Sequence, residues 1–319
     1  FLRKSDLAMY RVLELAPVRG SYRGHEVLSF PPPGGGSKLI SMLRILEGFP
    51  SAFLAADATD RHHAIIEAAR IAHFGGGAGG GSGLPEALAG VRPQGREPGG
   101  TSAPSITAGR AIPRAEIAPA LPEHCVQSGE STTQVSVVDR EGNVVSLTQT
   151  LGRSFGAKVA TPGLGFAYNS FLESFHVSDP SCPGFIAPRM PCPSDMAPTI
   201  VFEDGGPWVA LGTPGSSRIP SILATVLSNL LDRDLDLREA VAAPRVLWGG
   251  IRGLRAFVEV AGPVTAEQAA ELASWGHEEL TVVSYPPEKR ADIAEMGGVN
   301  AALWDRRAGT FLGVIDPRR

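Results

Sequence analysis

The chain has 319 residues, with 29 basic and 33 acidic side chains, a net charge of −4 and 43% hydrophobic residues. Such a length buries a full core in one large domain or two ordinary ones, and the nearly balanced charge argues against a general nucleic-acid binder, whose surface would be basic. The sequence has no uninterrupted run of 18 apolar residues, so no membrane span is predicted, and its three cysteines are too few for a disulfide scaffold.

The first part of the chain, residues 1–74, predicts helices around a single strand. The apolar spacing predicts helices at about 6–15, 39–47 and 60–74 and a strand at 22–30. Prolines and glycines at 31–36 interrupt regular structure. Gly48 stands where the C-cap of the second helix belongs. The chain begins at Phe1 rather than at a methionine, and we expect it to be processed or truncated.

Residues 75–114 differ in composition from the rest of the chain. They are rich in Gly, Pro, Ala, Ser and Arg, contain almost no large apolar side chains and show no period. Two interpretations are open. A flexible linker or surface loop has this composition. Translation of GC-rich DNA in the wrong frame gives the same mixture, and forty residues without regular structure are unusual inside a compact domain.

From residue 132 onward, the sequence predicts alternating strands and helices. Two hairpins are expected, from strands at 134–138 and 144–150 and at 199–202 and 208–211. Later helices are expected at 217–231, 237–242 and 266–275, and further strands at 257–260 and 280–284. Blocks of this kind indicate an α+β or a layered α/β fold.

Two familiar kinds of site are not predicted. His62, His63 and His73 lie on the third helix, but their spacing is not that of a known ligand motif, so no metal is predicted. The loop 212–218 precedes a helix as a phosphate-binding loop does, but no P-loop lysine follows it, and the chain has no G-x-S-x-G elbow.

The segment that begins at Thr132 and Thr133 carries more information. From the residues alone, two threonines at the entrance of a strand are more often ordinary strand formers than nucleophiles. Several segments, taken in their order along the chain, favour a nucleophile over an ordinary strand former. They are TTQVSVVDREGNVVSLTQT, FGAKVATPGLGFAYNSFLESF, MAPTIVFEDGGPWVALGTPGSSRI, AVAAPR and the closing GVIDPRR.

Together these segments resemble the small subunit of the γ-glutamyltransferases. YRGHEVLSFPPPGGGS and MLRILEGF resemble the end of the large subunit of that family, whose front half has no counterpart here. The resemblance implies an N-terminal-nucleophile hydrolase fold, an α+β four-layer αββα sandwich. It divides the chain into a large-subunit part (1–74), a linker and pre-cleavage segment (75–131) and a small-subunit catalytic domain (132–319).

The resemblance also implies that the chain cleaves itself between Ser131 and Thr132. A threonine hydroxyl is a poor nucleophile at neutral pH and needs an adjacent base. Cleavage frees an α-amino group on the same residue, which titrates near pH 8. The hydroxyl would then attack an amide carbonyl, form an acyl-enzyme and pass the acyl group to water or an amine. No cofactor is needed.

Other positions match the family's site. Thr150 matches a second threonine that hydrogen-bonds to the nucleophile, and Gly215 and Ser216 match the pair whose backbone N–H groups form the oxyanion hole. Such a donor contributes about 3 kcal/mol to transition-state binding. The family has glycine at both positions, and serine keeps the N–H but restricts the backbone.

Five residues stand at the positions that bind the substrate in the family: Gly152, Glu173, Ser174, Ser194 and Asp195. Gly152 replaces the usual asparagine, and Ser174 replaces an aspartate that pairs with the substrate ammonium. Ser194 and Asp195 replace a serine pair that binds the substrate carboxylate, and the new anion would repel that group. These changes predict altered glutamyl recognition beside intact hydrolytic machinery.

Three interpretations of function remain open. We favour an N-terminal-threonine amidohydrolase or acyltransferase that acts on another acyl group. A true γ-glutamyltransferase or glutathione hydrolase is the second, and a non-catalytic remnant that folds without maturing is the third. The expected partners are a small amide substrate, water or an amine acceptor, and the missing large-subunit half or another copy of the chain.

The cysteines and the compartment stay open as well. Cys182 and Cys192 flank a proline-rich loop and either pair in an oxidising compartment or remain free thiols. The family resemblance implies a periplasmic or secreted protein, whereas the residues themselves give no compartment.

Overall fold

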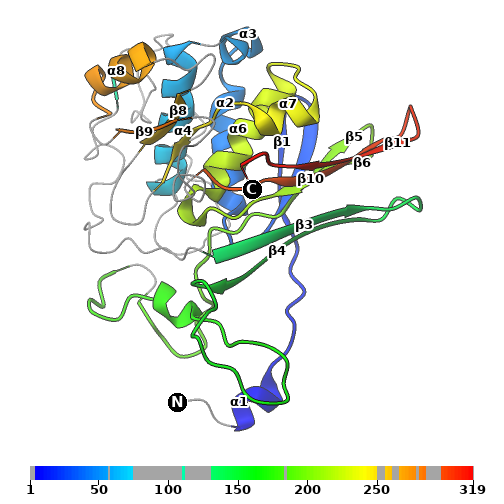
Figure 1. The fold of residues 1–319 in the computed structure, drawn as a ribbon, viewed down its shortest axis with the longest axis vertical. Coiled ribbons are helices and arrows are strands. Elements are labelled where there is room, and N and C mark those ends of the chain that lie inside the picture. Colours follow the sequence, from blue (N-terminus) through cyan, green and yellow to red (C-terminus); the bar gives the residue numbers. More distant parts are fainter. Residues whose placement is uncertain are drawn as a thin grey trace, which may run out of the picture.

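The computed structural model describes residues 4–56, 58–74, 110–111, 131–182, 185–249, 256–260, 266–277, 280–284 and 296–318. Most of the Gly/Pro-rich stretch and of the predicted pre-cleavage segment lies outside these residues. Helices and mainly antiparallel strands form separate layers in the described part (Figure 1), which confirms the α+β class. None of the described helices combines the length and hydropathy that a membrane span requires.

The central layer is a six-stranded sheet in which every neighbouring pair is antiparallel. In sheet order its strands are β1 (Val18–Tyr22), β2 (His25–Ser29), β5 (Thr199–Glu203), β6 (Gly206–Gly212), β10 (Asn300–Asp305) and β11 (Thr310–Ile315). The hairpins from the beginning and the end of the chain therefore form the two edges of the sheet, and β5 and β6 form its centre.

Three long helices cover one face of this sheet: α2 (Gly36–Glu47), α4 (Thr59–Phe74) and α6 (Ile219–Leu231). Helix α2 packs on β1 and β2, and α6 packs on β6, α2 and α4. Every residue from Ile219 to Leu230 is buried, as expected of a helix that is apolar on all sides. The short helices α3 (Ser51–Ala55) and α7 (Leu237–Ala242) flank this layer.

A long hairpin covers the opposite face of the sheet. It consists of β3 (Ser131–Val138) and β4 (Val144–Gly152), which contact β5, β6 and β10 (Figure 1). Side chains along β4 alternate between half-buried and exposed, because one face of the hairpin packs on the central sheet. Among the described residues, these two strands form a sheet of their own.

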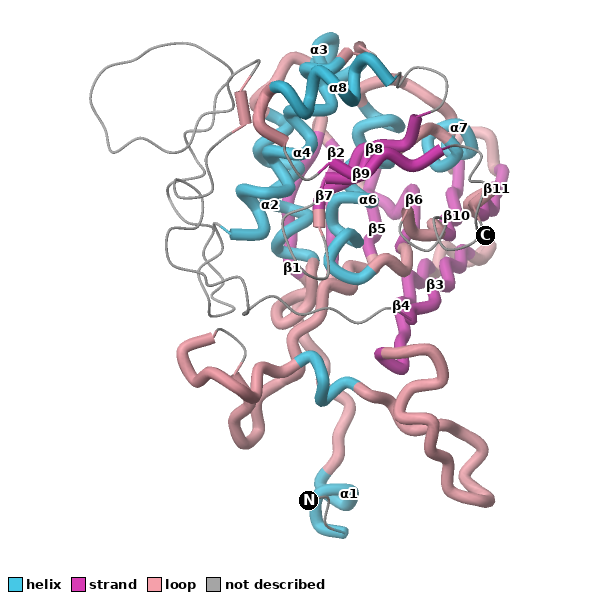
Figure 2. The backbone as a smooth tube through the Cα atoms, turned by 60° about the vertical axis from the view of Figure 1, so that its left-hand side comes forward, coloured by secondary structure: helices cyan, strands magenta, loops and turns pink. Residues whose placement is uncertain are grey.

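A small three-stranded sheet lies beside α4. Its strands are β7 (Val246–Trp248), β8 (Ala256–Val260) and β9 (Leu280–Ser284). Helix α8 (Ala266–Ser274) connects β8 to β9, which pair in parallel, and it also packs against α4. Figure 2 shows α1 (Lys4–Met9) and the loops that follow β4, including the 3₁₀ turn at Phe171–Ser174, at the end of the molecule opposite α3.

Two predicted elements differ from the structure. The strand expected at 22–30 is in fact part of a hairpin, because Arg23 and Gly24 turn the chain with φ angles of 50° and 81°. The helix expected at 6–15 ends at Met9. The other predicted helices and the two hairpins are confirmed with shifted ends, and Gly48 caps α2 by donating its N–H to the carbonyls of Ile45 and Leu46.

Candidate active site

Thr132 and Thr150 lie opposite each other at the open end of the β3–β4 hairpin. Both are half-buried, and the register shifts between Ser131 and Thr132, at the bond where cleavage is predicted. The Thr150 Oγ1 atom accepts a hydrogen bond of 2.9 Å from the N–H of Gly152. The hairpin thus brings two hydroxyl-bearing side chains from positions 18 residues apart to one cross-strand pair.

Gly215 and Ser216 form a sharp turn between β6 and α6. Their φ angles are 149° and 55°. A Cβ atom on Gly215 would lie 2.7 Å from Cδ1 of Ile222, so no larger residue fits without a shift. A serine in the left-handed region is uncommon and costs of order 1 kcal/mol. Backbone strain of this kind is concentrated at functional sites.

The packing of the hairpin on the central sheet shows in which direction β6 runs before it reaches this turn. The Gln134 side chain fills the space that a Cβ atom on Gly212 would need. The Ser146 Oγ atom, further along the hairpin, donates to the carbonyl of Leu211 at 2.8 Å. From Leu211 to Gly212 the strand β6 therefore runs toward the open end of the hairpin, where Thr132 lies, and Gly215 follows three residues later.

Gln134 is a contributor that the sequence analysis did not single out. Its side chain is buried, accepts a bond of 2.5 Å from Thr148 Oγ1 and donates to Ser146 Oγ at 3.0 Å. Its own carbonyl accepts from Asn300 Nδ2 at 3.1 Å. Two residues after Thr132, Gln134 therefore joins the hairpin to β10 through its backbone carbonyl and packs against β6 at Gly212 through its side chain. The alternation of the strand puts residue 134 on the buried face, which was the only available signal.

The predicted substrate-binding residues Gly152 and Glu173 lie together. A Cβ atom on Gly152 would lie 2.5 Å from Oγ of Ser170. That hydroxyl donates to Glu173 Oε1 at 2.8 Å, and Arg153 pairs with the other carboxylate oxygen at 2.6 Å. Ser170 therefore occupies the space beside Gly152 into which a side chain at that position would project.

Cys192 links Ser174 to the loop that carries the other predicted binding residues, Ser194 and Asp195. The Cys192 thiol is within hydrogen-bonding reach of the Ser174 side chain and donates to the carbonyl of Phe171 at 3.3 Å. Burial raises the pKa of this thiol above its ordinary value. Cys192 is free whereas Cys182 is disulfide-bonded, so these two cysteines do not pair with each other.

Ser194 and Asp195 pack on the loop that precedes α2. The N–H of Ser194 donates to the carbonyl of Pro33 at 3.0 Å, and Asp195 accepts a bond of 2.6 Å from Nζ of Lys38. Burial by itself raises the pKa of the Asp195 carboxyl, but the nearby Lys38 ammonium outweighs it and holds the pKa below its usual value. The anion that the sequence placed at this position thus has a cation beside it.

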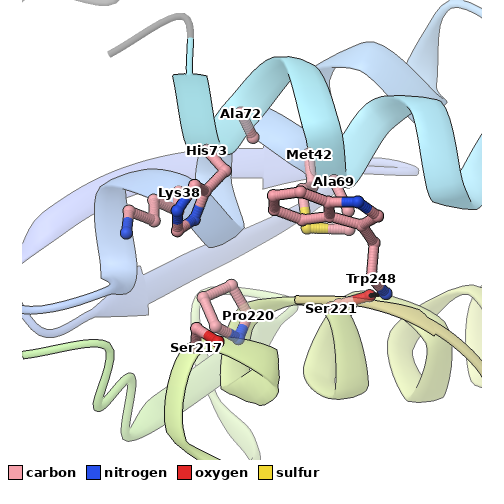
Figure 3. A pocket seen from close by; sticks show the side chains of 9 residues that line it. All are labelled: Lys38, Met42, Ala69, Ala72, His73, Ser217, Pro220, Ser221 and Trp248. Atoms are coloured by element: carbon pink, nitrogen blue, oxygen red, sulfur yellow. Dashed lines mark hydrogen bonds between the residues drawn. The ribbon is translucent and has the colours of Figure 1, made fainter. Parts of the chain in front are cut away.

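A small pocket opens between Lys38 and the start of α6. Figure 3 shows Lys38 and His73 on one side and Ser217 and Pro220 on the other. Ser217 directly follows the Gly215–Ser216 turn, and its Oγ atom is buried without a hydrogen-bond partner among the described residues. Burial and then Lys38 lower the pKa of His73 to about 3, so its imidazole is neutral at physiological pH.

The architecture and the comparisons with known proteins agree on the class and the family. The cephalosporin acylase from Bacillus halodurans shares this fold with a TM-score of 0.73 at 23% identity over 99% of this chain and 54% of that chain. This chain therefore shares its sandwich of sheets and helices with that acylase, and a γ-glutamyltranspeptidase from Pseudomonas nitroreducens is similar as well, with a TM-score of 0.50 at 32% identity over 59% of this chain and 95% of that chain. Both agree with the N-terminal-nucleophile hydrolase fold expected from the sequence. The family profile described as Gamma-glutamyltranspeptidase matches residues 1–319, so the chain belongs to the γ-glutamyltranspeptidase family.

Two curated relatives carry different activities in their names. The glutathione hydrolase proenzyme of Pseudomonas sp. (strain A14) is 36% identical, over 100% of this chain and 56% of that protein. The acylase ACY 1 proenzyme of Pseudomonas sp. (strain V22) is 38% identical, over 97% of this chain and 52% of that protein. The chain thus spans about half the length of these relatives, and the two names leave its acyl group undecided.

Proposed function

We propose that this chain carries the catalytic half of a self-processing amide hydrolase or acyltransferase, with Thr132 as its nucleophile. The observation that supports it most directly is the pairing of Thr132 with Thr150 at the open end of the hairpin, toward which β6 runs before the Gly215–Ser216 turn. The names of two relatives as proenzymes agree with a reaction that starts only after cleavage.

The proposed reaction needs only groups of the chain itself. Once the peptide bond before Thr132 is cut, the free α-amino group of Thr132 accepts the proton of the Thr132 hydroxyl. The hydroxyl oxygen then attacks the amide carbonyl of the substrate. The carbonyl oxygen becomes an oxyanion that accepts hydrogen bonds from the N–H groups of Gly215 and Ser216. The tetrahedral intermediate then collapses, the amine of the substrate leaves with the proton, and water or another amine takes the acyl group from the ester.

We favour an acyl group other than γ-glutamyl. The charged groups beside the expected binding loops already have partners within the chain, because Lys38 pairs with Asp195 and Arg153 pairs with Glu173. Ser170 fills the space beside Gly152. A γ-glutamyl substrate is the second candidate, and the glutathione hydrolase relative supports it.

Maturation is tested by denaturing electrophoresis and N-terminal sequencing of the purified chain. We expect a fragment that begins at Thr132 and contains 188 residues, from 319 − 132 + 1. Thr132→Ala should remove both the fragment and any turnover, while Thr133→Ala, which changes the neighbouring exposed threonine, should mature normally. A wild-type chain that stays uncut after long incubation supports the non-catalytic interpretation.

Substrate choice is tested separately, on matured protein. A chromogenic γ-glutamyl anilide is compared with anilides of simple aliphatic and dicarboxylic acids. We expect a higher kcat/KM for one of the latter. A clear preference for the glutamyl compound would reverse our preference for the acyl group and leave the proposed nucleophile intact.

The outer face of the β3–β4 hairpin is apolar and exposed, which is typical of a surface that binds another polypeptide. Val135, Val137, Val145 and Leu147 project from it and are 42%, 46%, 49% and 46% exposed. A two-stranded sheet with one open apolar face is only marginally stable in water. Since relatives are about twice as long, we infer that the polypeptide equivalent to their remaining half covers this face.

The outer face is tested with Val145→Lys in the chain alone. We expect the wild type to bind an apolar fluorescent dye and the variant to bind less of it, with unfolding free energy changed by less than about 0.5 kcal/mol because the site is exposed. Leu172→Lys is the control, because it makes the same kind of change at an exposed residue of the 3₁₀ turn, away from the hairpin. A dimer that Val145→Lys dissociates would identify a second copy as the occupant.

A further inference from the structure

A buried cluster of three side chains lies far from the candidate active site in sequence and joins α4 to the loop after α8. His63 and Glu67 are one helical turn apart on α4, and His277 follows α8 by three residues. Their side chains are almost fully buried, at 1%, 0% and 6% exposed. One ligand atom from each lies within 4.8 Å of the other two.

We propose that His63, Glu67 and His277 bind a zinc ion that fastens α8 and its sheet to the helix layer. The i, i+4 spacing puts two donors on one face of α4, and the third donor approaches from a separate element. Two imidazoles and a carboxylate are a ligand set that zinc uses in proteins, with water as the fourth ligand.

The interatomic distances show what must move for a zinc ion to bind. His63 Nδ1 lies 2.8 Å from His277 Nε2, whereas Glu67 Oε1 lies 3.8 Å from the other ring nitrogen of His277, Nδ1. Bonds of about 2.0–2.1 Å in tetrahedral geometry separate two ligand atoms by about 3.3 Å. The two imidazoles must therefore move apart by about half an ångström, and the His277 ring or the Glu67 carboxylate must turn so that one nitrogen of His277 faces both other ligands, all of which lie within 4.8 Å of one another.

The surroundings hold the ligands in place. The His63 ring meets the Trp275 ring edge-on, with centroids 5.4 Å apart, and Thr59 donates to Glu271 at 2.5 Å to join the same two helices.

The positive charge of Arg70 opposes a cation at this site. It forms an ion pair with Glu67 one turn along α4. Its charge competes with the metal for the carboxylate, so it should weaken zinc binding without preventing it. Removing Arg70 therefore separates the two cases. The arginine weakens the binding of a metal ion, whereas it stabilises a cluster that is held only by hydrogen bonds.

The test begins with the metal-free 319-residue chain, titrated with Co²⁺ as a spectroscopic probe and then with Zn²⁺. We expect one Co²⁺ per chain with the strong visible absorption of four-coordinate cobalt, displacement by one Zn²⁺, and a higher Tm in the presence of zinc. His277→Ala and Glu67→Gln should remove the absorption. His25→Ala is the matched control, because that histidine lies on β2 and stacks on Trp208.

Arg70→Gln provides the decisive comparison. Removing a positive charge a few ångströms from the ion should tighten zinc binding about tenfold. A wild-type chain that gives no cobalt absorption and binds no zinc overturns the proposal, and this measurement needs no variant to fold. Binding that survives both His277→Ala and Glu67→Gln overturns it equally, since the metal would then be held elsewhere.

Discussion

Lys38 and Asp195 show how a single residue alters the prediction made for its neighbour. Without Lys38, the partly buried carboxylate at residue 195 would repel an anionic substrate. With it, the pair is neutral. We expect Lys38→Met to destabilise the chain by about 1–2 kcal/mol, because the carboxylate loses its partner while about a third of the lysine site remains open to solvent. Urea unfolding followed by fluorescence measures the change.

Two further variants separate charge from packing at this site. Lys38→Arg keeps the cation and should cost less than Lys38→Met. The double variant Lys38→Met/Asp195→Asn removes both charges and should recover part of the loss, since no unpaired ion remains. The single variant Asp195→Asn completes the comparison. If the double variant loses more stability than Lys38→Met and Asp195→Asn lose together, the ion pair does not account for the effect.

Gly152 offers a second test at the scale of one residue. Its φ angle is 86°, and an added Cβ atom would lie 2.5 Å from Oγ of Ser170. Gly163 has the same φ of 86°, yet a Cβ atom there would meet nothing within 4 Å. Gly163→Ala should cost about 1 kcal/mol from the backbone alone. Gly152→Ala should cost about 1–3 kcal/mol more, because Ser170 must also move. Equal losses in thermal unfolding would show that Ser170 yields freely.

Helix α4 links stability to pH through a buried histidine. His62 is 2% exposed, and burial, followed by Arg61 and Arg233, lowers its pKa to about 3. In the unfolded chain the pKa of His62 is about 6.5. Between pH 6.5 and pH 3 this histidine is therefore protonated in the unfolded chain and neutral in the folded chain. Stability should therefore be full above pH 6.5 and fall toward pH 3, by up to about 1.4 kcal/mol per pH unit from this residue.

His62→Leu keeps a similar volume and removes the titrating group. Between pH 7 and 5, we expect the unfolding free energy of this variant to fall less steeply than that of the wild type. If His62→Leu follows the wild-type pH curve, the proton uptake has another origin.

At the scale of elements, the sequence predicted what local pattern determines. Helices α2, α4 and α6 follow from apolar residues at helical spacing, and the β3–β4 hairpin follows from alternation around a Gly–Asn turn. The β1–β2 turn was missed because Arg23, not glycine, adopts the first positive φ there. Strands β10 and β11 were not predicted because neither alternates with period two: residues 301–304 of β10 are all apolar, and Gly313 interrupts β11.

The candidate site divides in the same way. Thr132, Thr150 and the Gly215–Ser216 turn were predicted through family resemblance, since threonine in a strand has no chemical signal of its own. The ion pair of Lys38 with Asp195 joins positions 157 residues apart, and the contact of His63 with His277 spans 214 residues. No local pattern encodes such contacts, because the fold alone brings these residues together.

At the scale of the whole molecule, two segments that resemble family signatures meet in one buried ion network. Arg245 pairs with Asp316 at 2.5 Å, and Arg318 pairs with the other oxygen of the same carboxylate at 2.9 Å. Asp316 also accepts the N–H of Val299 at 2.9 Å. Arg318 donates to the carbonyl of Ala243, just after α7. The last residues of the chain are thereby tied to α7 and to the strand β10.

Asp316→Ala should therefore weaken the entire fold rather than one end of it. The change leaves two buried guanidinium groups without their shared carboxylate, and we expect a loss of about 3–5 kcal/mol in urea unfolding. Asp204→Ala is the matched control: it breaks an Asp–Arg pair of 2.7 Å with Arg307 whose side chains are 65% and 80% exposed, so it should change stability by less than about 1 kcal/mol. Hydrogen exchange tells a global loss from local fraying. Faster exchange confined to β11 would show that the network secures only the end of the chain, whereas faster exchange in α6 and the central strands as well is what a shared anchor requires.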